Sequence, residues 1–396
     1  MRTPVILVAG QNGTDQVVTA LLRRPGTLLI EHRFDGHVVR RTSTTRQHGM
    51  MTTAEVGLEL AHGCISCTIR NDLMIYLRQL HRRSDVDRVV VRLAPWLEPE
   101  PICLAINHVR VRVAPGYVDG PAALDVAIAA VVSCLDTSVW LRQALGDDEL
   151  DDGRTVAQVV VNQAEFADVA VLDRANPVAA AVLQRLSPRA RVQVTAAGIE
   201  DALSDLHREA RRGRSDDPHG PLLLGQPPLE SRTQVGLVEF NARRPFHPQR
   251  LHECLDLLLD GVVRSRGRLW LATEPTEAMW LESAGSGMGV SSAGKWLAAS
   301  TSAEIADVDA ERRAFAELSW DARHGDRHSA MTILTYGARP ADITNALRGA
   351  VLTDDEFRSP QDWMHYEDPF GDWQEGSCEA EGAENAAARN IQHGER

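Results

Sequence analysis

The stretch Val5-Ile-Leu-Val-Ala-Gly10-Gln-Asn-Gly-Thr-Asp-Gln-Val17 decides the fold of this chain. Its first five residues are apolar and mostly β-branched, which predicts a buried strand over residues 5–9. Gly10 and Gly13 predict a tight loop, and the Thr and Asp that follow are good N-cap residues for a helix over residues 17–24. The order strand, glycine loop, helix is typical of the first unit of an α/β domain.

The same alternation continues along the first half of the chain. The next apolar runs predict strands at residues 27–30, 88–93, 126–135 and 169–172. Between the first two of these strands, an apolar stripe predicts one amphipathic helix at residues 73–83. Alternating strands and helices indicate a doubly wound, mostly parallel sheet. The predicted fold class is therefore α/β, with the first domain over residues 1–205.

Beyond the first domain the composition changes. Residues 206–233 combine arginine, proline and glycine without apolar periodicity, which predicts a linker. Residues 234–357 return to strands and helices, including predicted helices at 248–259 and 340–350, and we expect a smaller α+β domain there. Residues 358–396 carry many acidic and few apolar side chains, which predicts a disordered acidic tail.

Composition narrows the range of functions. The 396 residues carry 42 Lys and Arg against 55 Asp and Glu, and this net charge of −13 argues against a general DNA or RNA coat. Lys295 is the only lysine, so any mechanism that requires a lysine at another position is excluded. The 6 cysteines are spread thinly, as in proteins of a reducing compartment. Without a signal-peptide pattern or a membrane-length apolar run, we expect a soluble cytoplasmic protein.

The loop after the first strand has the glycines of a phosphate-binding loop but not its chemistry. Such loops cradle phosphate with backbone N–H groups, a lysine, and a Ser or Thr hydroxyl for magnesium. Here Gln16 stands at the lysine position and Val17 at the hydroxyl position, while Asp15 places a carboxylate at the mouth. The candidate nucleotide contacts are Gly10, Gly13 and Gln16. Either the loop binds nucleotide without turnover, or it only connects strand and helix.

Two cysteines at C-x-x-C spacing, Cys64 and Cys67, are the candidate metal ligands. Such a pair can wrap two sulfurs around one tetrahedral Zn²⁺, and its occupancy falls as free metal falls. His62 is a candidate third ligand, and Glu31 or Glu55 could also complete the site. Two alternatives stay open, a thiol–disulfide switch with a lowered thiol pKa and a pair of purely structural cysteines.

Arginine clusters stand out against the acidic total, most of all in the predicted linker. A guanidinium can bind phosphate through two parallel hydrogen bonds, so an exposed cluster can dock on RNA, whereas the alternative is a solvated linker. The candidate partner-binding residues are Arg208, Arg211, Arg212 and Arg214.

Four histidines of the second domain fit either a second metal site or ordinary polar contacts: His247, His252, His324 and His328.

Several segments together resemble the CobW family of metallochaperone GTPases. In the first domain these are the glycine loop, Gly63-Cys-Ile-Ser-Cys-Thr-Ile-Arg-Asn-Asp-Leu73 and Gln163-Ala-Glu-Phe-Ala-Asp168. In the second they are Arg244-Pro-Phe-His-Pro-Gln-Arg-Leu251, Gly261-Val-Val-Arg-Ser-Arg-Gly-Arg-Leu-Trp270 and Gly325-Asp-Arg327. The resemblance implies a P-loop-like doubly wound domain followed by a CobW C-terminal domain, and it leaves out only the tail.

This sequence departs from the family pattern where the family handles nucleotide and metal. Arg92 occupies the Walker B carboxylate position, Pro95 replaces the switch glycine, and the guanine-reading segment stands as Asp173-Arg-Ala-Asn176. Ser66 replaces the middle cysteine of the family's metal motif. Since phosphoryl transfer uses the lost groups, we expect a pseudo-GTPase that is not an enzyme and does not use GTP, with zinc as a regulatory metal.

The resemblance extends to a mycobacterial branch of the family that engages ribosomes under zinc starvation. It implies a zinc-responsive factor that helps a hibernation factor bind the small ribosomal subunit, through rRNA or ribosomal proteins. On this hypothesis low zinc empties the Cys64 and Cys67 site and permits ribosome binding, with neither membrane nor free DNA as a partner. The alternative is a zinc metallochaperone with weak GTP binding or hydrolysis.

Overall fold

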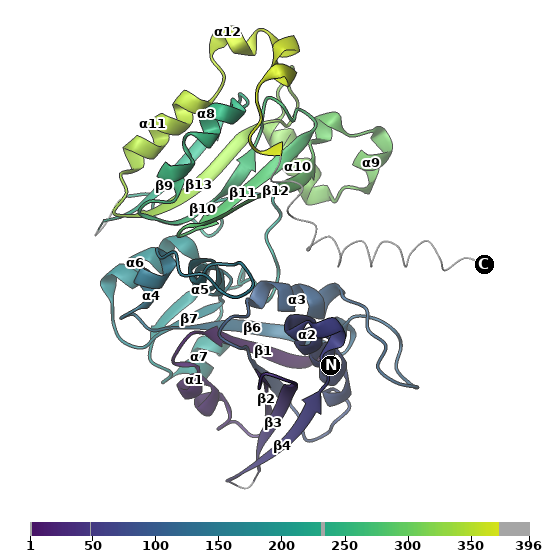
Figure 1. The fold of residues 1–396 in the computed structure, drawn as a ribbon. Coiled ribbons are helices and arrows are strands. Elements are labelled where there is room, and N and C mark those ends of the chain that lie inside the picture. Colours follow the sequence, from purple (N-terminus) through teal and green to yellow (C-terminus); the bar gives the residue numbers. More distant parts are fainter. Residues whose placement is uncertain (1, 48, 231–233, 372–396) are drawn as a thin grey trace, which may run out of the picture. The chain divides into compact units, whose positions relative to one another are not determined.

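The computed structural model describes residues 2–47, 49–230 and 234–371. The chain divides into two compact units, each described by itself (Figure 1). The first unit comprises Met1–Gln143 and Val159–Ser215, and the second comprises Ala144–Gln158 and Asp216–Arg396. The division after Ser215 falls inside the predicted linker of residues 206–233, so the first part of that segment belongs to the first unit.

The first unit is built on an eight-stranded sheet in the order β4-β3-β2-β5-β1-β6-β7-β8. Its strands are β1 (Thr3–Gly10), β2 (Thr27–Phe34), β3 (Val39–Gln47), β4 (Met50–Leu58), β5 (Arg88–Arg92), β6 (Val126–Leu135), β7 (Val169–Leu172) and β8 (Arg191–Val194). β1 pairs in parallel with β5 and with β6, while β3 pairs antiparallel with both β2 and β4. The predicted α/β class with a mostly parallel sheet is thereby confirmed.

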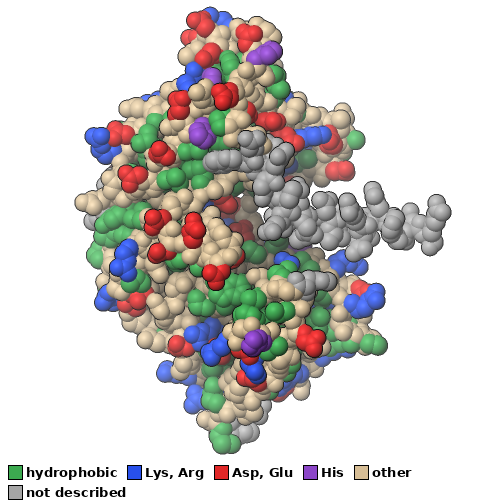
Figure 2. Space-filling model, viewed as in Figure 1, with side chains coloured by type: hydrophobic (Ala, Val, Ile, Leu, Met, Phe, Trp, Pro, Cys, Tyr) green, Lys and Arg blue, Asp and Glu red, His purple; other side chains and the backbone are tan. Residues whose placement is uncertain are grey.

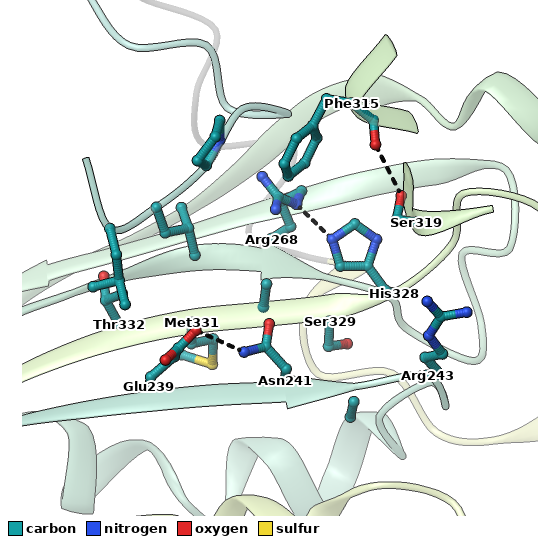
Figure 3. A pocket seen from close by; sticks show the side chains of 15 residues that line it. Glu239, Asn241, Arg243, Arg268, Phe315, Ser319, His328, Ser329, Met331 and Thr332 are labelled. Carbon is teal, nitrogen blue, oxygen red and sulfur yellow. Dashed lines mark hydrogen bonds between the residues drawn. The ribbon is translucent and has the colours of Figure 1, made fainter. Parts of the chain in front are cut away.

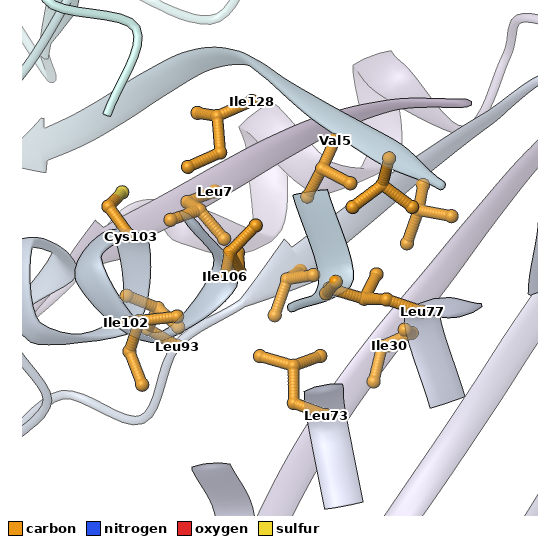
Figure 4. Packing of buried hydrophobic residues seen from close by; sticks show 14 of the residues in the cluster. Val5, Leu7, Ile30, Leu73, Leu77, Leu93, Ile102, Cys103, Ile106 and Ile128 are labelled. Atoms are coloured by element: carbon orange, nitrogen blue, oxygen red, sulfur yellow. The ribbon is translucent and has the colours of Figure 1, made fainter. Parts of the chain in front are cut away.

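Helices cover both faces of this sheet (Figure 1). They are α1 (Thr14–Leu21), α2 (Ile65–Leu80), α3 (Pro99–His108), α4 (Trp140–Ala144), α5 (Val156–Glu165), α6 (Pro177–Leu186) and α7 (Ile199–Ser204), with short 3₁₀ turns η1 (Ala61–Gly63) and η2 (Ala122–Leu124). Val5 and Leu7 of β1 point to the face that α2 and α3 cover (Figure 4), while Ile6 and Val8 point to the face of α1 and α7. The period-2 alternation of a strand thus feeds two apolar layers.

The second unit contains a five-stranded antiparallel sheet in the order β12-β11-β10-β13-β9. Its elements are β9 (Val235–Ala242), α8 (Pro248–His252), η3 (Leu255–Leu258), β10 (Val262–Leu269), β11 (Glu277–Ala284), β12 (Gly287–Lys295), η4 (Leu297–Ala299), α9 (Ser302–Asp307), α10 (Ala310–Ser319), β13 (Ser329–Tyr336), α11 (Pro340–Ala350), α12 (Asp354–Phe357) and η5 (Pro360–His365). Leu251 of α8 and Leu347 of α11 join Phe240 of β9 in one apolar cluster on one sheet face. This confirms the smaller α+β domain.

The first part of the predicted acidic tail is folded in the structure, contrary to the prediction that it is disordered. Residues 358–371 belong to the described chain, and Trp363 and Phe370 are buried in apolar clusters of the second unit. These two aromatic side chains therefore place the start of the segment within the fold. The rest of the predicted tail, residues 372–396, lies outside the described residues. In the described ranges, no helix combines the length and apolar character that crossing a bilayer requires.

Candidate functional site

The glycine loop between β1 and α1 has the backbone geometry that its two glycines predict. Gly10 has a φ of 140°, and a Cβ there would lie 2.4 Å from the carbonyl oxygen of Cys134. Gly13 has a φ of 79° and is the N-cap of α1. A residue with a side chain adopts neither conformation readily, so the loop keeps the tight turn of a phosphate-binding loop.

Arg92, at the end of β5, forms two ion pairs beside this loop. Its Nη1 lies 2.6 Å from Asp15 Oδ1 on α1 and 3.1 Å from Glu31 Oε1 on β2. One guanidinium is thus shared by two carboxylates, at the position to which the sequence resemblance assigns a magnesium-binding carboxylate. The charge of this arrangement is net negative without any phosphate, and a triphosphate would add to the repulsion.

The segment that follows β5 is tied to the glycine loop by amide groups. Gln11 Nε2 donates to the carbonyl of Pro95 at 2.6 Å, and buried Gln163 donates to the same carbonyl at 2.8 Å. Gln163 Nε2 also donates to the carbonyl of Leu97 at 2.9 Å. The carbonyl of Pro95, the residue that the resemblance assigns to the switch glycine, is therefore held by the glycine loop through Gln11 and by α5 through Gln163.

The cavity next to the loop is small. It encloses about 90 Å³ and is lined by Gly13, Gln16 and Asp173, among others. Pockets for small-molecule ligands in proteins usually enclose about 300–1,000 Å³. The structure thus brings Gly13 and Gln16 together around a space smaller than a nucleotide, whereas Gly10 is not among the residues that line it.

The segment at the guanine-reading position uses its side chains internally. Asn176 Oδ1 accepts hydrogen bonds from the N–H groups of Val178 and Ala179 and so caps α6. Asp173 Oδ1 accepts the N–H and the hydroxyl of Thr137, both at 2.8 Å. The two side chains stabilise the start of α6 and the loop after β6.

Cys64 and Cys67 lie together at the start of α2. Cys64 is the N-cap, and its Sγ accepts the backbone N–H of Cys67 at 3.1 Å. Both thiols are half-buried and free of disulfides. The neighbouring Cys64 sulfur and burial raise the pKa of Cys67, while Arg70, whose Nη2 lies 3.8 Å from that sulfur, opposes the rise. A raised pKa disfavours the reactive thiolate that a redox switch needs, whereas a metal displaces the thiol protons.

The other candidate ligands do not join the thiols in the described part of the chain. His62 lies in η1, but its side chain is outside the described residues. Glu31 pairs with Arg92, and Glu55 lies 2.8 Å from Arg40. Among the described residues, no three His, Cys, Asp or Glu side chains gather as a metal site, so the four histidines of the second unit form none with one another.

Comparison with known proteins identifies the family. Residues 30–199 match the CobW/HypB/UreG nucleotide-binding domain, and residues 235–351 match the cobalamin synthesis protein cobW C-terminal domain. A protein of Mycobacterium tuberculosis named zinc chaperone Rv0106 is 64% identical over 378 residues, which cover 96% of this chain and 95% of the relative. The chain belongs to the CobW family. The resemblance predicted from the motifs is confirmed.

Two further proteins resemble this chain more distantly. The zinc-regulated GTPase metalloprotein activator 1 of Dictyostelium discoideum is 24% identical over 375 residues, covering 87% of this chain and 74% of its own. The crystal structure of Zn(II)-bound YjiA GTPase from E. coli is 14% identical, with a TM-score of 0.40, covering 89% of this chain and 100% of that chain.

The candidate partner-binding arginines of this CobW chain differ in exposure. Arg211 is buried, with its guanidinium 5.6 Å from the ring of Phe166. The backbone N–H of Arg212 donates to the buried carboxylate of Asp168 at 3.0 Å. Arg208, Arg212 and Arg214 are exposed. On the face that Figure 2 presents, basic and acidic side chains are interspersed rather than gathered in one basic area.

Sequence reasoning missed one set of residues in the CobW C-terminal domain. Arg264, Arg266 and Arg268 alternate along β10, and Arg268 is 2% exposed at the floor of a cavity of about 460 Å³. The available signal was the spacing of three arginines by two residues within a predicted strand region. Such spacing places all three on one face of a sheet.

Proposed function

We propose that this CobW protein is a zinc-responsive binding protein that does not hydrolyse GTP. The observation that carries the proposal is Arg92, whose guanidinium pairs with Asp15 and Glu31 at the phosphate-type loop. Phosphoryl transfer depends on cationic groups and magnesium that neutralise the transferred phosphoryl group. Gln16 and Val17 supply neither the lysine nor the hydroxyl for that task.

Zinc is the ligand that fits the thiol pair. Cys64 and Cys67 present two soft sulfurs at the N-terminus of α2. Two sulfurs from one chain leave two positions of a tetrahedral zinc for exchangeable ligands. Binding of this kind follows the free zinc concentration, and the names of the relatives, a zinc chaperone and a zinc-regulated activator, support zinc as the metal.

The zinc part is tested with purified protein and a chromophoric zinc chelator as competitor. We expect the double substitution Cys64→Ser and Cys67→Ser to weaken zinc binding at least tenfold. Cys254→Ser, which changes a half-buried cysteine of the second unit, is the control and should bind zinc as the unsubstituted protein does. Unchanged zinc affinity in the double variant would remove the thiol pair from the proposal.

The nucleotide part is tested by phosphate release from magnesium GTP. We expect no release above that of buffer, with or without zinc. A steady turnover that Gly10→Ala abolishes would show that the loop still catalyses hydrolysis, and the non-enzymatic proposal would be wrong.

We further propose that zinc-free protein binds the small ribosomal subunit and helps a hibernation factor bind there. The sequence resemblance supports this role, and the exposed Arg208, Arg212 and Arg214 are the candidate contacts with rRNA phosphates. Co-sedimentation with ribosomes at graded zinc tests it, and we expect pelleting that zinc suppresses. Pelleting that is absent at every zinc concentration would contradict the ribosomal role.

The second candidate function is a zinc metallochaperone, which the names of the relatives favour. It requires transfer of zinc to a client protein that depends on GTP. A transfer assay with a metal-free zinc protein as acceptor separates the two, because the first proposal expects no effect of GTP on the rate.

A further inference from the structure

A cavity of about 460 Å³ lies on one face of the second unit's sheet (Figure 3). Val238 and Phe240 of β9 point into the apolar cluster under α8 and α11, so Glu239 and Asn241, which alternate with them, point to the opposite face. The floor of the cavity is this opposite face of the sheet, where β9, β13 and β10 lie side by side. Phe315 of α10 and the segment 221–223 form its walls.

Arg268 is the buried cation of this cavity. Its Nε donates to His328 Nε2 at 3.2 Å, and its Nη1 donates to the carbonyls of Pro218 and Gly220, both at 2.7 Å. In the part of the chain that the structure describes, Nη2 has no hydrogen-bond acceptor and no carboxylate is in direct contact with this guanidinium. The more distant carboxylate of Asp217 attracts it, and the ring centroid of Phe315 lies 5.5 Å from it. Burial lowers the pKa of Arg268 only to about 10, so the group stays positively charged at neutral pH. A buried charge without a counter-ion in direct contact is costly, and an anionic ligand bound to Nη2 would offset that cost.

The surroundings of Arg268 select the kind of anion. Nε and Nη1 are already engaged, so the guanidinium offers Nη2 to one oxygen rather than two parallel donors to a phosphate. Its neighbour His328 adds no second charge, because burial lowers the pKa of that imidazole to about 4. Among the other lining residues, the negative charge of the exposed Glu239 offsets the positive charge of the exposed Arg243. These features favour a single negative charge over a dianion.

The rest of the lining is suited to an apolar group. Leu222, Leu223 and Phe315 face the cavity from one side, and Ala330 lies on the floor. The volume falls in the usual range for small-molecule pockets. We propose that this cavity binds a monocarboxylate with an apolar body, whose carboxylate pairs with Arg268 while its body contacts the leucines and Phe315. This site is separate from the zinc and nucleotide residues of the proposed function.

The carboxylate can come from a free organic acid or from the C-terminus of a peptide that ends in an apolar residue. The full-length protein is titrated calorimetrically with 4-methylpentanoate, with acetyl-Ala-Ala-Leu, with the same peptide as its C-terminal amide, and with inorganic phosphate. We expect binding of at least one of the two carboxylates and at least tenfold weaker binding of the amide and of phosphate. Preference for the organic acid or for the peptide identifies the source.

Variants assign the binding to this cavity. Arg268→Gln should weaken binding of the carboxylate at least tenfold. Because loss of a buried arginine can also unfold the domain, Ala330→Leu, which fills the cavity without removing a polar group, should weaken it similarly. Arg339→Gln, which removes an exposed cation on α11's N-cap, is the control and should bind normally.

The proposal would be overturned if neither carboxylate binds, if the peptide binds equally well as acid and as amide, or if both cavity variants keep the affinity of the unsubstituted protein. Tighter binding of phosphate than of the acids would replace the carboxylate assignment and so also contradict it. The Cys64→Ser and Cys67→Ser protein should bind the acid normally, which separates this test from that of the zinc site.

Discussion

Single glycines hold the turn between β1 and α1. Gly10→Ala would place a Cβ 2.4 Å from the Cys134 carbonyl oxygen at a backbone φ of 140°, so strand β1 or β6 would have to shift. We expect this substitution to lower the free energy of unfolding by at least about 2 kcal/mol. Urea unfolding followed by circular dichroism measures the change.

Gly57→Ala is the matched control for this prediction. Gly57 lies in β4, and a Cβ there would meet no atom within 4 Å. Alanine loses less conformational entropy than glycine on folding, so we expect no change or a gain of up to about 1 kcal/mol. Equal effects of the two substitutions would show that the close contact at Gly10 is not what constrains this turn.

The residue types of the nucleotide site could be predicted from the sequence, but their partners could not. Gln16 and Arg92 were visible as departures from a linear motif. Asp15 was identified as a carboxylate at the mouth of the loop and Glu31 as one residue that could complete the zinc site, and both pair with Arg92. The three residues come from α1, β2 and β5, and only the order of strands in the sheet brings them together. Arg268 was missed for the same reason, since its burial depends on chain segments from 218 to 332.

At the scale of elements, Glu356 joins α12 to α8. Its carboxylate accepts two hydrogen bonds from Arg250, both at 2.8 Å, and one from the backbone N–H of Thr353 at 2.8 Å. Chiefly the Arg250 contact lowers the pKa of Glu356 from 4.5 to about 2. Because the folded-state pKa lies below the unfolded one, this stabilisation is present above about pH 4.5 and is lost as pH falls towards 2.

We expect Glu356→Gln to lower the free energy of unfolding by about 1–3 kcal/mol at pH 7. Between pH 4.5 and 2, the difference between the variant and the unsubstituted protein should shrink, because the native carboxylate then becomes protonated. Urea titrations at a series of pH values measure this. Glu317→Gln, which removes an exposed carboxylate of α10, serves as the control, and a pH-independent difference for Glu356→Gln would contradict the ion-pair explanation.

Helices and strands could be predicted where buried side chains recur at a regular spacing or form a continuous apolar run. They could not be predicted where the side chains are mostly exposed. β1, β6 and β7 are apolar runs that are buried on both faces, and both β6 and β7 have the predicted bounds. β3 and β4 were missed because the side chains of β4 are almost all exposed, so no apolar alternation marks this edge hairpin. α2 begins at Ile65, earlier than predicted, because its first turns carry the polar residues of the cysteine segment. The predicted helix 248–259 is divided into α8 and η3.

For the whole molecule, the sequence predicted two folded parts but not their exact composition. The change of composition after residue 205 marks the end of the regular α/β pattern. No local signal shows that Ala144–Gln158 belongs to the second unit, because that assignment depends on contacts such as those of Gly285 with Gly146 and Ala157. The arginine-rich segment looked like a linker because the carboxylate of Asp168, which holds Arg212, is distant in sequence.

Separate apolar clusters predict that the two units respond separately to core substitutions. Leu73 of α2 and Leu347 of α11 are both fully buried, and they belong to clusters that share no residue. Replacing a buried leucine by alanine costs about 2–5 kcal/mol, which for a unit of this size corresponds to roughly 5–15 °C in the unfolding temperature. We expect calorimetry to resolve two transitions, with Leu73→Ala lowering one and Leu347→Ala the other. Val118→Ala, at a site 76% exposed, should lower neither, and a common shift of a single transition by both leucine variants would show that the units unfold together.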